Sequence, residues 1–249
     1  MVYFLLVFAI SLPFWILGAL MAAQLLPGLP VSALAFVCPA VAAAILVYRK
    51  SGIAAVGELF KRAFDANRVG NGLWYTAALL TMPLIMVLSF FVIRISNAAI
   101  PLPTFSVPNT VGLIAVFFIA ALGEEIGWTG YALDPLQEKF GPIMAGIIIG
   151  LVWALWHFLP LAQAHRAPDF IAWWTLGTVS ARLIMVWLYN STRKSVFITT
   201  LFHAMINVSW QLFPINGSFY DPQITGSITA VVTISIVVLW TLRRKVSTA

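Results

Sequence analysis

The sequence is poor in charge and in cysteine. Aspartate, glutamate, lysine and arginine make up only 9% of its 249 residues, and hydrophobic residues make up 61%, whereas about a quarter of a soluble domain is charged. Because Cys38 is the only cysteine, the chain can form neither a disulfide framework nor a thiolate metal site. No basic stretch precedes the first apolar run and no clear cleavage site follows it, so we expect an uncleaved first span. These absences indicate a polytopic membrane protein.

Long apolar runs recur along the whole chain. A helix needs about 20 residues to cross a hydrocarbon core of about 30 Å. The runs predict an all-α polytopic membrane protein of about eight transmembrane helices, with residues 1–249 forming a single transmembrane domain. The predicted spans are Tyr3–Leu25, Val31–Tyr48, Leu73–Ile95, Thr110–Tyr131, Ile143–Leu161, Phe170–Tyr189, Val196–Phe213 and Ile224–Leu242.

The net charge of +6 comes from short basic clusters between the runs, which indicates membrane topology and no nucleic-acid partner. Lysine and arginine beside the spans are retained on the cytoplasmic side, so both termini are predicted to be cytoplasmic in a cell membrane. The segment 51–72 fits either an amphipathic helix on the membrane surface or a solvated loop. The cytoplasmic set is Arg49, Lys50, Lys61, Arg62, Arg68, Lys139, Arg193, Lys194, Arg243, Arg244 and Lys245; the other side has only Arg94 and Arg166.

Two adjacent glutamates, Glu124 and Glu125, follow the apolar run 111–122. An ionisable group at bilayer depth costs at least about 3 kcal/mol, so it usually faces a protein-lined interior and marks a functional site. A structural reading, with both carboxyls protonated and bonded to backbone, is the alternative. We therefore predict an intramembrane cavity around this pair.

Two later runs each carry a histidine with a partner four residues away. Residues four apart share one helix face, so Trp153 lies beside His157, and Asn207 beside His203. Taken singly, the first pair also fits an interfacial aromatic belt and the second an interhelical hydrogen bond.

In this order the three motifs resemble those of the CPBP family of intramembrane proteases, also called the CAAX protease or Abi family. The family pattern is Glu-Glu-x-x-x-Arg, then aromatic-x-x-x-His, then His-x-x-x-Asn, and the resemblance covers about residues 110–208. It implies that Glu124 is the general base for a water molecule and that Glu125 supports it. His157 and His203 would polarise this water or ligate a metal, and Asn207 would stabilise the oxyanion.

Two positions depart from the family pattern. Thr129 stands where the motif has arginine, and Trp153 where phenylalanine is common. Threonine cannot supply a positive charge near Glu125. Arg182 is the one basic residue far from a predicted helix end, and we hypothesise that it pairs with Glu125; the alternative is that it snorkels to the interface.

The histidines and Glu124 fit either a metal site or water activation without a metal. His157, His203 and Glu124 would satisfy the usual ligand set for a divalent metal such as catalytic zinc, but the His-Glu-x-x-His signature is absent and water activation without metal is the alternative. Straight spans would leave Glu124 and His157 about 10 Å apart in depth, given about 1.5 Å per residue. Strong tilt, or a segment 132–140 that dips into the membrane before the next helix begins, would be needed to bring them together.

These features predict an intramembrane endopeptidase acting on a membrane-associated or prenylated (CAAX-type) peptide. The alternatives are a protein without catalytic activity, such as a peptide-binding or bacteriocin-immunity protein, and a proton-coupled transporter that uses the glutamates as a relay. The expected partners are the lipid bilayer and a lipidated peptide, and the oligomeric state is left open.

Overall fold

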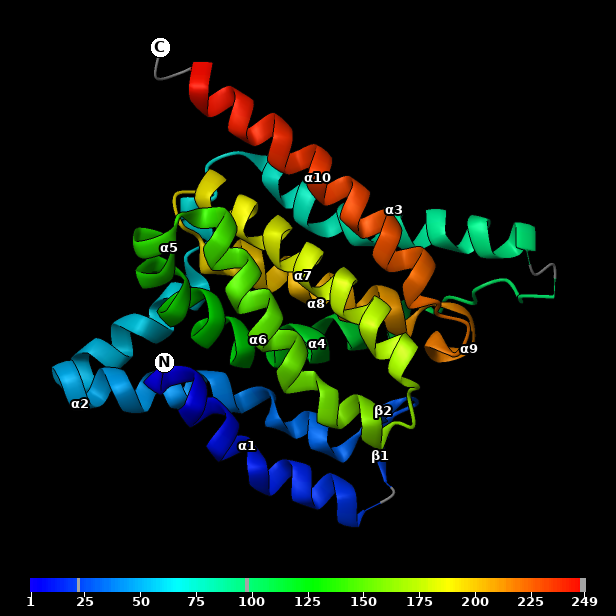
Figure 1. Cartoon of the computed structure of the whole chain (residues 1–249), viewed down its shortest axis with the longest axis horizontal. Helices are drawn as coiled ribbons and strands as arrows, with labels where there is room; N and C mark the ends of the chain where they lie inside the picture. The colour runs from blue at the N-terminus through cyan, green and yellow to red at the C-terminus, as the bar shows by residue number, and fades with distance from the viewer. Residues whose placement is uncertain (22, 97–98, 247–249) are drawn as a thin grey trace.

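A computed structural model describes residues 1–21, 23–96 and 99–246, with side chains up to Arg243. The side chains of Arg244 and Lys245, which belong to the predicted cytoplasmic set, lie outside the described part. Its long helices pack side by side (Figure 1). The elements in order are α1 Val2–Leu20, β1 Gln24–Leu26, β2 Leu29–Pro30, η1 Val31–Val37, α2 Cys38–Lys61, η2 Arg62–Phe64, η3 Ala66–Arg68, α3 Gly72–Ser96, α4 Val107–Gly127, η4 Trp128–Leu133, α5 Asp134–Phe140, α6 Pro142–Gln163, α7 Pro168–Ser191, α8 Val196–Gln211, α9 Pro214–Gly217 and α10 Pro222–Val246.

The predicted all-α membrane fold is confirmed. The described residues contain seven helical segments long and apolar enough to cross a membrane. The remaining predicted span, Val196–Phe213, is α8, which has 16 residues and is buried along much of its length. It packs against α3, α4 and α7 in the interior, so it contributes to the core more than to the lipid-facing surface.

Two predicted boundaries near the N-terminus differ from the structure. The span Tyr3–Leu25 ends early, because α1 stops at Leu20 and residues 24–30 form a two-stranded hairpin with Gly28 at a φ of 77°. The segment 51–72 is not a plain loop. Helix α2 continues to Lys61 after a break at Gly52, where φ is again 77°, a backbone conformation that glycine adopts easily.

The predicted span Thr110–Tyr131 is too short. Helices α4, η4 and α5 form one helical segment from Val107 to Phe140. Glu124 therefore lies 16 residues before the end of this segment, and His157 lies 15 residues after the start of α6 at Pro142. At about 1.5 Å per residue, both side chains are about 23 Å from the turn between the segments. The predicted depth mismatch is absent because the helix continues past Tyr131.

The basic clusters meet at one end of the bundle, which we call the basic end. Arg62 and Lys194 both contact the carboxylate of Asp134, at 3.4 and 3.0 Å. Arg193 donates to the backbone carbonyl of Arg68 at 2.8 Å. Residues distant in sequence thus share this end, as the positive-inside pattern predicts.

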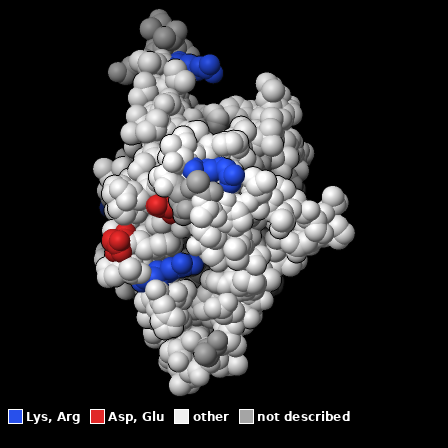
Figure 2. All heavy atoms as spheres, turned by 90° about the vertical axis from the view of Figure 1, so that its right-hand side faces the viewer, with Lys and Arg blue, Asp and Glu red and all other residues white. Residues whose placement is uncertain are grey.

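The opposite end, which we call the charge-poor end, carries the β1–β2 hairpin and α9 (Figure 1). Seen from this side, few charged side chains interrupt an otherwise uncharged surface (Figure 2). The basic residues here are those predicted: Arg94 donates to the carbonyl of Ile100 at 2.9 Å, and the Arg166 guanidinium lies 4.8 Å from the ring centre of Phe170.

Asp65 fixes the start of α8. Its carboxylate accepts hydrogen bonds from the hydroxyl of Ser195 at 2.7 Å and from the backbone N–H groups of Val196 and Phe197 at 3.2 and 3.1 Å. The first N–H groups of a helix have no partner within the helix, so such a cap stabilises it. It also holds the helix that presents His203 two turns further on.

Candidate active site

Five of the predicted site residues line one cavity of about 610 Å³ between the helices: Glu124, Trp153, His157, His203 and Asn207. They come from α4, α6 and α8. The predicted intramembrane cavity is therefore present, and the three motifs face it together.

Glu124 is 5% exposed and uses its two oxygens differently. Oε2 accepts a hydrogen bond of 2.7 Å from the indole N–H of Trp153. Oε1 lies 4.0 Å from Nε2 of His203. This distance is too long for a direct hydrogen bond, but a water molecule placed between the two atoms could contact both.

Glu125 lies behind the cavity wall and is fully buried. Arg182 donates to both of its oxygens, at 2.7 and 3.0 Å. The hypothesised pair is present, and the snorkelling alternative is wrong, because Arg182 is only 1% exposed. Two parallel bonds of this kind are the strongest way for a guanidinium to hold a carboxylate.

Thr129 completes this arrangement without supplying charge. Its hydroxyl donates to Oε2 of Glu125, and Nη1 of Arg182 lies 3.4 Å from the same hydroxyl. The positive charge that position 129 lacks is therefore supplied from α7. The Arg182 guanidinium also lies 4.4 Å from the ring centre of Trp153, so it contacts both motif helices.

Glu125 also orients His203. Nδ1 of His203 lies 2.9 Å from Oε1 of Glu125. A carboxylate can only accept, so Nδ1 carries the proton that is donated, and in the neutral ring Nε2 is left as an acceptor on the side of Glu124. The carboxylate behind the wall thus fixes which nitrogen faces the cavity.

His157 packs against a cluster of tryptophan rings. Its Nδ1 is 2.9 Å from the carbonyl oxygen of Trp153, so this nitrogen is the donor, and in the neutral ring Nε2 is an acceptor. The ring packs against Trp156 and Trp174 at centroid distances of 4.7 and 5.3 Å. His157 is half-buried and faces the cavity, which argues against a lipid-facing aromatic belt.

The donor atoms do not form a preformed metal site. Within residues 1–21, 23–96 and 99–246, no three His, Cys, Asp or Glu side chains lie together as metal ligands would. Nδ1 of His203 is used by Glu125, and Nδ1 of His157 by a carbonyl group. A metal bound by Glu124, His157 and His203 stays a prediction, and no step below depends on it.

Two glycines let α4 approach its neighbours closely beside the glutamates. A Cβ atom at Gly123 would meet Phe36 at 2.7 Å, and one at Gly127 would overlap the Tyr3 hydroxyl and the Pro39 carbonyl group. The close packing that sets the depth and rotation of Glu124 therefore depends on the absence of these side chains.

We predict that Gly127→Ala lowers the unfolding free energy by about 1–3 kcal/mol, because an added methyl group must displace backbone atoms. The thermal midpoint of the purified protein in detergent measures this loss. Gly130→Ala, three residues on, is the matched control, since its Cβ would meet nothing nearer than 3.6 Å. Equal midpoints for the two variants would contradict the close-packing argument.

The sequence did not reveal how the basic end of the site is closed. Arg62 donates to the Gly130 carbonyl and to the Tyr189 hydroxyl, and this hydroxyl donates to Asp134 at 2.9 Å. Arg62 and Asp134 are 72 positions apart, so only their opposite charges could have suggested a pair. The hydrogen bond from Trp153 to Glu124 was also missed, although tryptophan alone among Phe, Tyr and Trp has an N–H donor.

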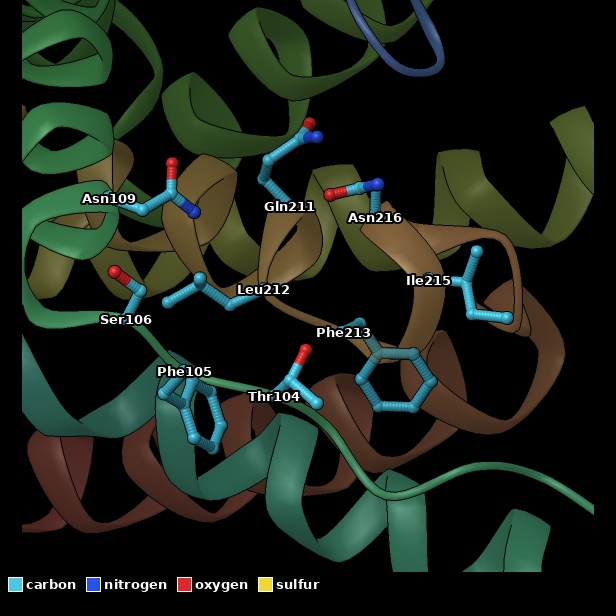
Figure 3. Close-up of a pocket in the computed structure, with 9 residues that line it drawn as sticks. All are labelled: Thr104, Phe105, Ser106, Asn109, Gln211, Leu212, Phe213, Ile215 and Asn216. Carbon is cyan, nitrogen blue, oxygen red and sulfur yellow. The ribbon is translucent and has the colours of Figure 1, made fainter.

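A second, smaller cavity of about 250 Å³ lies near the charge-poor end, where α8 ends and α4 begins (Figure 3). Its walls carry amide and hydroxyl groups but no titratable side chain: Thr104, Phe105, Ser106, Asn109, Gln211, Leu212, Phe213, Ile215 and Asn216. Its described lining therefore offers no acid or base.

Comparisons with known proteins agree with this geometry. Residues 105–209 match the family described as type II CAAX prenyl endopeptidase Rce1-like. The chain is 26% identical over 237 residues to CAAX prenyl protease 2 of Methanococcus maripaludis, covering 86% of this chain and 84% of that protein. It is 23% identical over 155 residues to lysostaphin resistance protein A of Staphylococcus haemolyticus, covering 61% of this chain and 39% of that protein. The resemblance to the CPBP family indicated by the motifs is confirmed.

Proposed function

Because residues 105–209 of this multi-pass membrane protein match the Rce1-like CAAX prenyl endopeptidases, we propose that the chain is an intramembrane endopeptidase that hydrolyses a peptide bond of a membrane-associated substrate. The observation that carries the proposal is the facing pair of Glu124 Oε1 and His203 Nε2, 4.0 Å apart in one cavity. A lipidated chain, including a CAAX-type tail, is one substrate of this class.

Water activation is the first step of the proposed reaction. A water molecule between the two atoms donates one hydrogen bond to Nε2 of His203 and gives a proton to Glu124, while its oxygen attacks the carbonyl carbon of the substrate. General base catalysis of this kind contributes about 10²- to 10⁴-fold to a rate. The hydrogen bond from Trp153 holds the other oxygen of Glu124 in place.

Collapse of the tetrahedral intermediate completes the reaction. The amide donor of Asn207 is the cavity group suited to the oxyanion, because a fixed donor in a dry site stabilises developing charge. Glu124 then gives its proton to the leaving amine as the C–N bond breaks. The products are a carboxylic acid and an amine, and the carboxylate of Glu124 is restored.

The test is cleavage by the purified protein of a panel of fluorogenic peptides, with and without a lipid group. In water enriched in ¹⁸O, one heavy atom should enter the new carboxyl group. A chelator titration in the same assay tests the predicted divalent metal, since loss of activity that zinc restores would support it. Absence of cleavage of every peptide, in a preparation with an intact thermal transition, would count against the proposal.

A proton-coupled transporter needs a route to both faces of the membrane. The described lining of the cavity contains no residue of the closed network around Arg62 and Tyr189, so this conformation reaches one face, as an alternating-access transporter does in each of its states. Proton-coupled peptide uptake into liposomes, without any cleavage product, would support the transporter instead.

We also predict a positioning role for Trp153. In Trp153→Phe the ring remains available to Arg182 and His203, which it contacts at 4.4 and 4.9 Å, but Glu124 loses its donor. A hydrogen bond to a charged group contributes about 1.5 kcal/mol or more, so kcat should fall about tenfold with KM nearly unchanged. Trp173→Phe is the control for loss of an indole, because Trp173 is 38% exposed and is not among the described residues that line the cavity. An unchanged kcat in Trp153→Phe would show that this bond does not position the base.

A further inference from the structure

By its described lining residues, the larger cavity reaches the charge-poor end of the molecule and not the basic end. Helices α4, α7 and α10 begin at the charge-poor end, and α3, α6 and α8 end there. The cavity residues of α4 run from Val116 to Glu124, those of α6 from Trp153 to Leu161, and those of α8 from His203 to Trp210. In each case they lie between the glutamate site and the charge-poor end.

The loops at the charge-poor end form the mouth. Gly28 of the β1–β2 hairpin, Arg166 between α6 and α7, and Tyr220 before α10 all line the cavity. Leu25, beside this mouth, is 44% exposed. The cavity therefore continues from the buried carboxylate of Glu124 to the charge-poor end, which is the side that faces the viewer in Figure 2.

Large side chains and paired charges fill the space between the glutamate site and the basic end. Trp128, Tyr189 and Arg182 are each 0–1% exposed. Beyond them, the network of Arg62, Tyr189 and Asp134 ties η2, α7 and α5 together. No member of this set is among the described residues that line the cavity, so the basic end is closed.

Charge assigns a membrane side to each end. Of the 14 lysines and arginines, only Arg94 and Arg166 are at the charge-poor end and Arg182 is buried at the site, which leaves 14 − 3 = 11 toward the basic end by sequence position. Lysine and arginine beside membrane spans mark the cytoplasmic side. The open end of the cavity is then the extracytoplasmic one.

We propose that this active-site cavity takes its peptide from the extracytoplasmic side of the membrane. This narrows the substrate class proposed above to an extracytoplasmic segment of a membrane-associated peptide, and it excludes a CAAX-type tail that is lipidated in the cytoplasm, because such a tail would arrive at the closed end. That the peptide is cleaved in this cavity rests on the function proposed above, whereas the direction from which the cavity is reached does not.

Single cysteines report the direction of access without any cleavage assay. In a Cys38→Ala background, Ala164→Cys places a thiol in the cavity mouth, and Ser51→Cys places one on an exposed position at the basic end. A membrane-impermeant maleimide added to right-side-out vesicles should label Ala164→Cys and spare Ser51→Cys, with the reverse in inverted vesicles. Labelling after denaturation normalises for the amount of protein.

Labelling of Ala164→Cys only in inverted vesicles would overturn the proposal. So would labelling from neither side when the denatured protein reacts, because the mouth would then be closed to water. Labelling from outside, as expected, predicts that a bulky maleimide lowers peptide cleavage by Ala164→Cys at least tenfold compared with the unlabelled sample of the same variant.

The two proposals fail separately in this design. External labelling without cleavage of any peptide would leave the access route standing and remove the protease function. Cleavage together with labelling only from the cytoplasmic side would leave the protease standing and remove the extracytoplasmic substrate.

Discussion

Replacing Glu124 by glutamine is expected to lower peptide cleavage by about 10²- to 10⁴-fold, the contribution of a general base. Glutamine has the same shape, and its amide oxygen can still accept the hydrogen bond from Trp153. It cannot take a proton from water at neutral pH. The measurement is kcat/KM with the best peptide of the fluorogenic panel.

Glu138→Gln is the matched control, because this carboxylate is exposed near the end of α5 and should have little effect on the rate. The thermal midpoint of Glu124→Gln should stay near that of the wild type, which separates loss of chemistry from loss of folding. If Glu124→Gln cleaves as fast as the wild type, the base assignment is wrong.

The second large effect is expected at the pair between Glu125 and Arg182. Breaking a buried pair leaves one charge without a partner, which costs about 3–5 kcal/mol of stability. Arg182→Met and Glu125→Gln should therefore each be strongly destabilising. The double variant removes both charges and should cost much less than the sum of the single losses, as measured by unfolding in detergent.

The exposed pair of Glu58 and Lys61 is the control for this cycle. Its side chains are 70% and 75% exposed, and pairs of this kind couple by only about 0–1 kcal/mol. Simple additivity at Glu125 and Arg182 would refute the pairing. Coupling no larger than that of the exposed pair would show that burial does not strengthen it.

A relocated arginine tests whether the charge or its helix matters. In Arg182→Met, adding Thr129→Arg puts a guanidinium one helical turn from Glu125, as in the usual family motif. This double variant should recover part of the stability and of the cleavage rate that Arg182→Met loses. No recovery would show that α7 supplies more than a positive charge, for example the contact of Arg182 with Trp153.

Loss of Arg182 is expected to affect activity because Glu125 has three hydrogen-bond partners from three helical segments. Thr129 belongs to η4, Arg182 to α7 and His203 to α8. A carboxylate bonded in this way fixes the imidazole that faces Glu124. Loss of the arginine should therefore lower activity through the position of His203, even in protein that still folds.

The helical spans could be predicted because a membrane selects long apolar runs, and each predicted span has a counterpart in the structure. Their ends were harder to predict. The helix that carries the glutamates continues past its predicted end at Tyr131, through Asp134, Glu138 and Lys139, to Phe140. Asp134 is tolerated there because Arg62 and Lys194 neutralise it, and this contact joins segments far apart in sequence.

The sequence by itself determined the membrane class, the order of the motifs and the residue types available for chemistry, since hydropathy and helical spacing are local properties. Only the tertiary structure decided that Arg182 replaces the charge missing at position 129, that Trp153 bonds to Glu124, and that the cavity opens at the charge-poor end. Those features depend on the depth, rotation and close approach of separate helices. Packing at positions such as Gly127 sets them, and no short stretch of sequence encodes the distance between two helices.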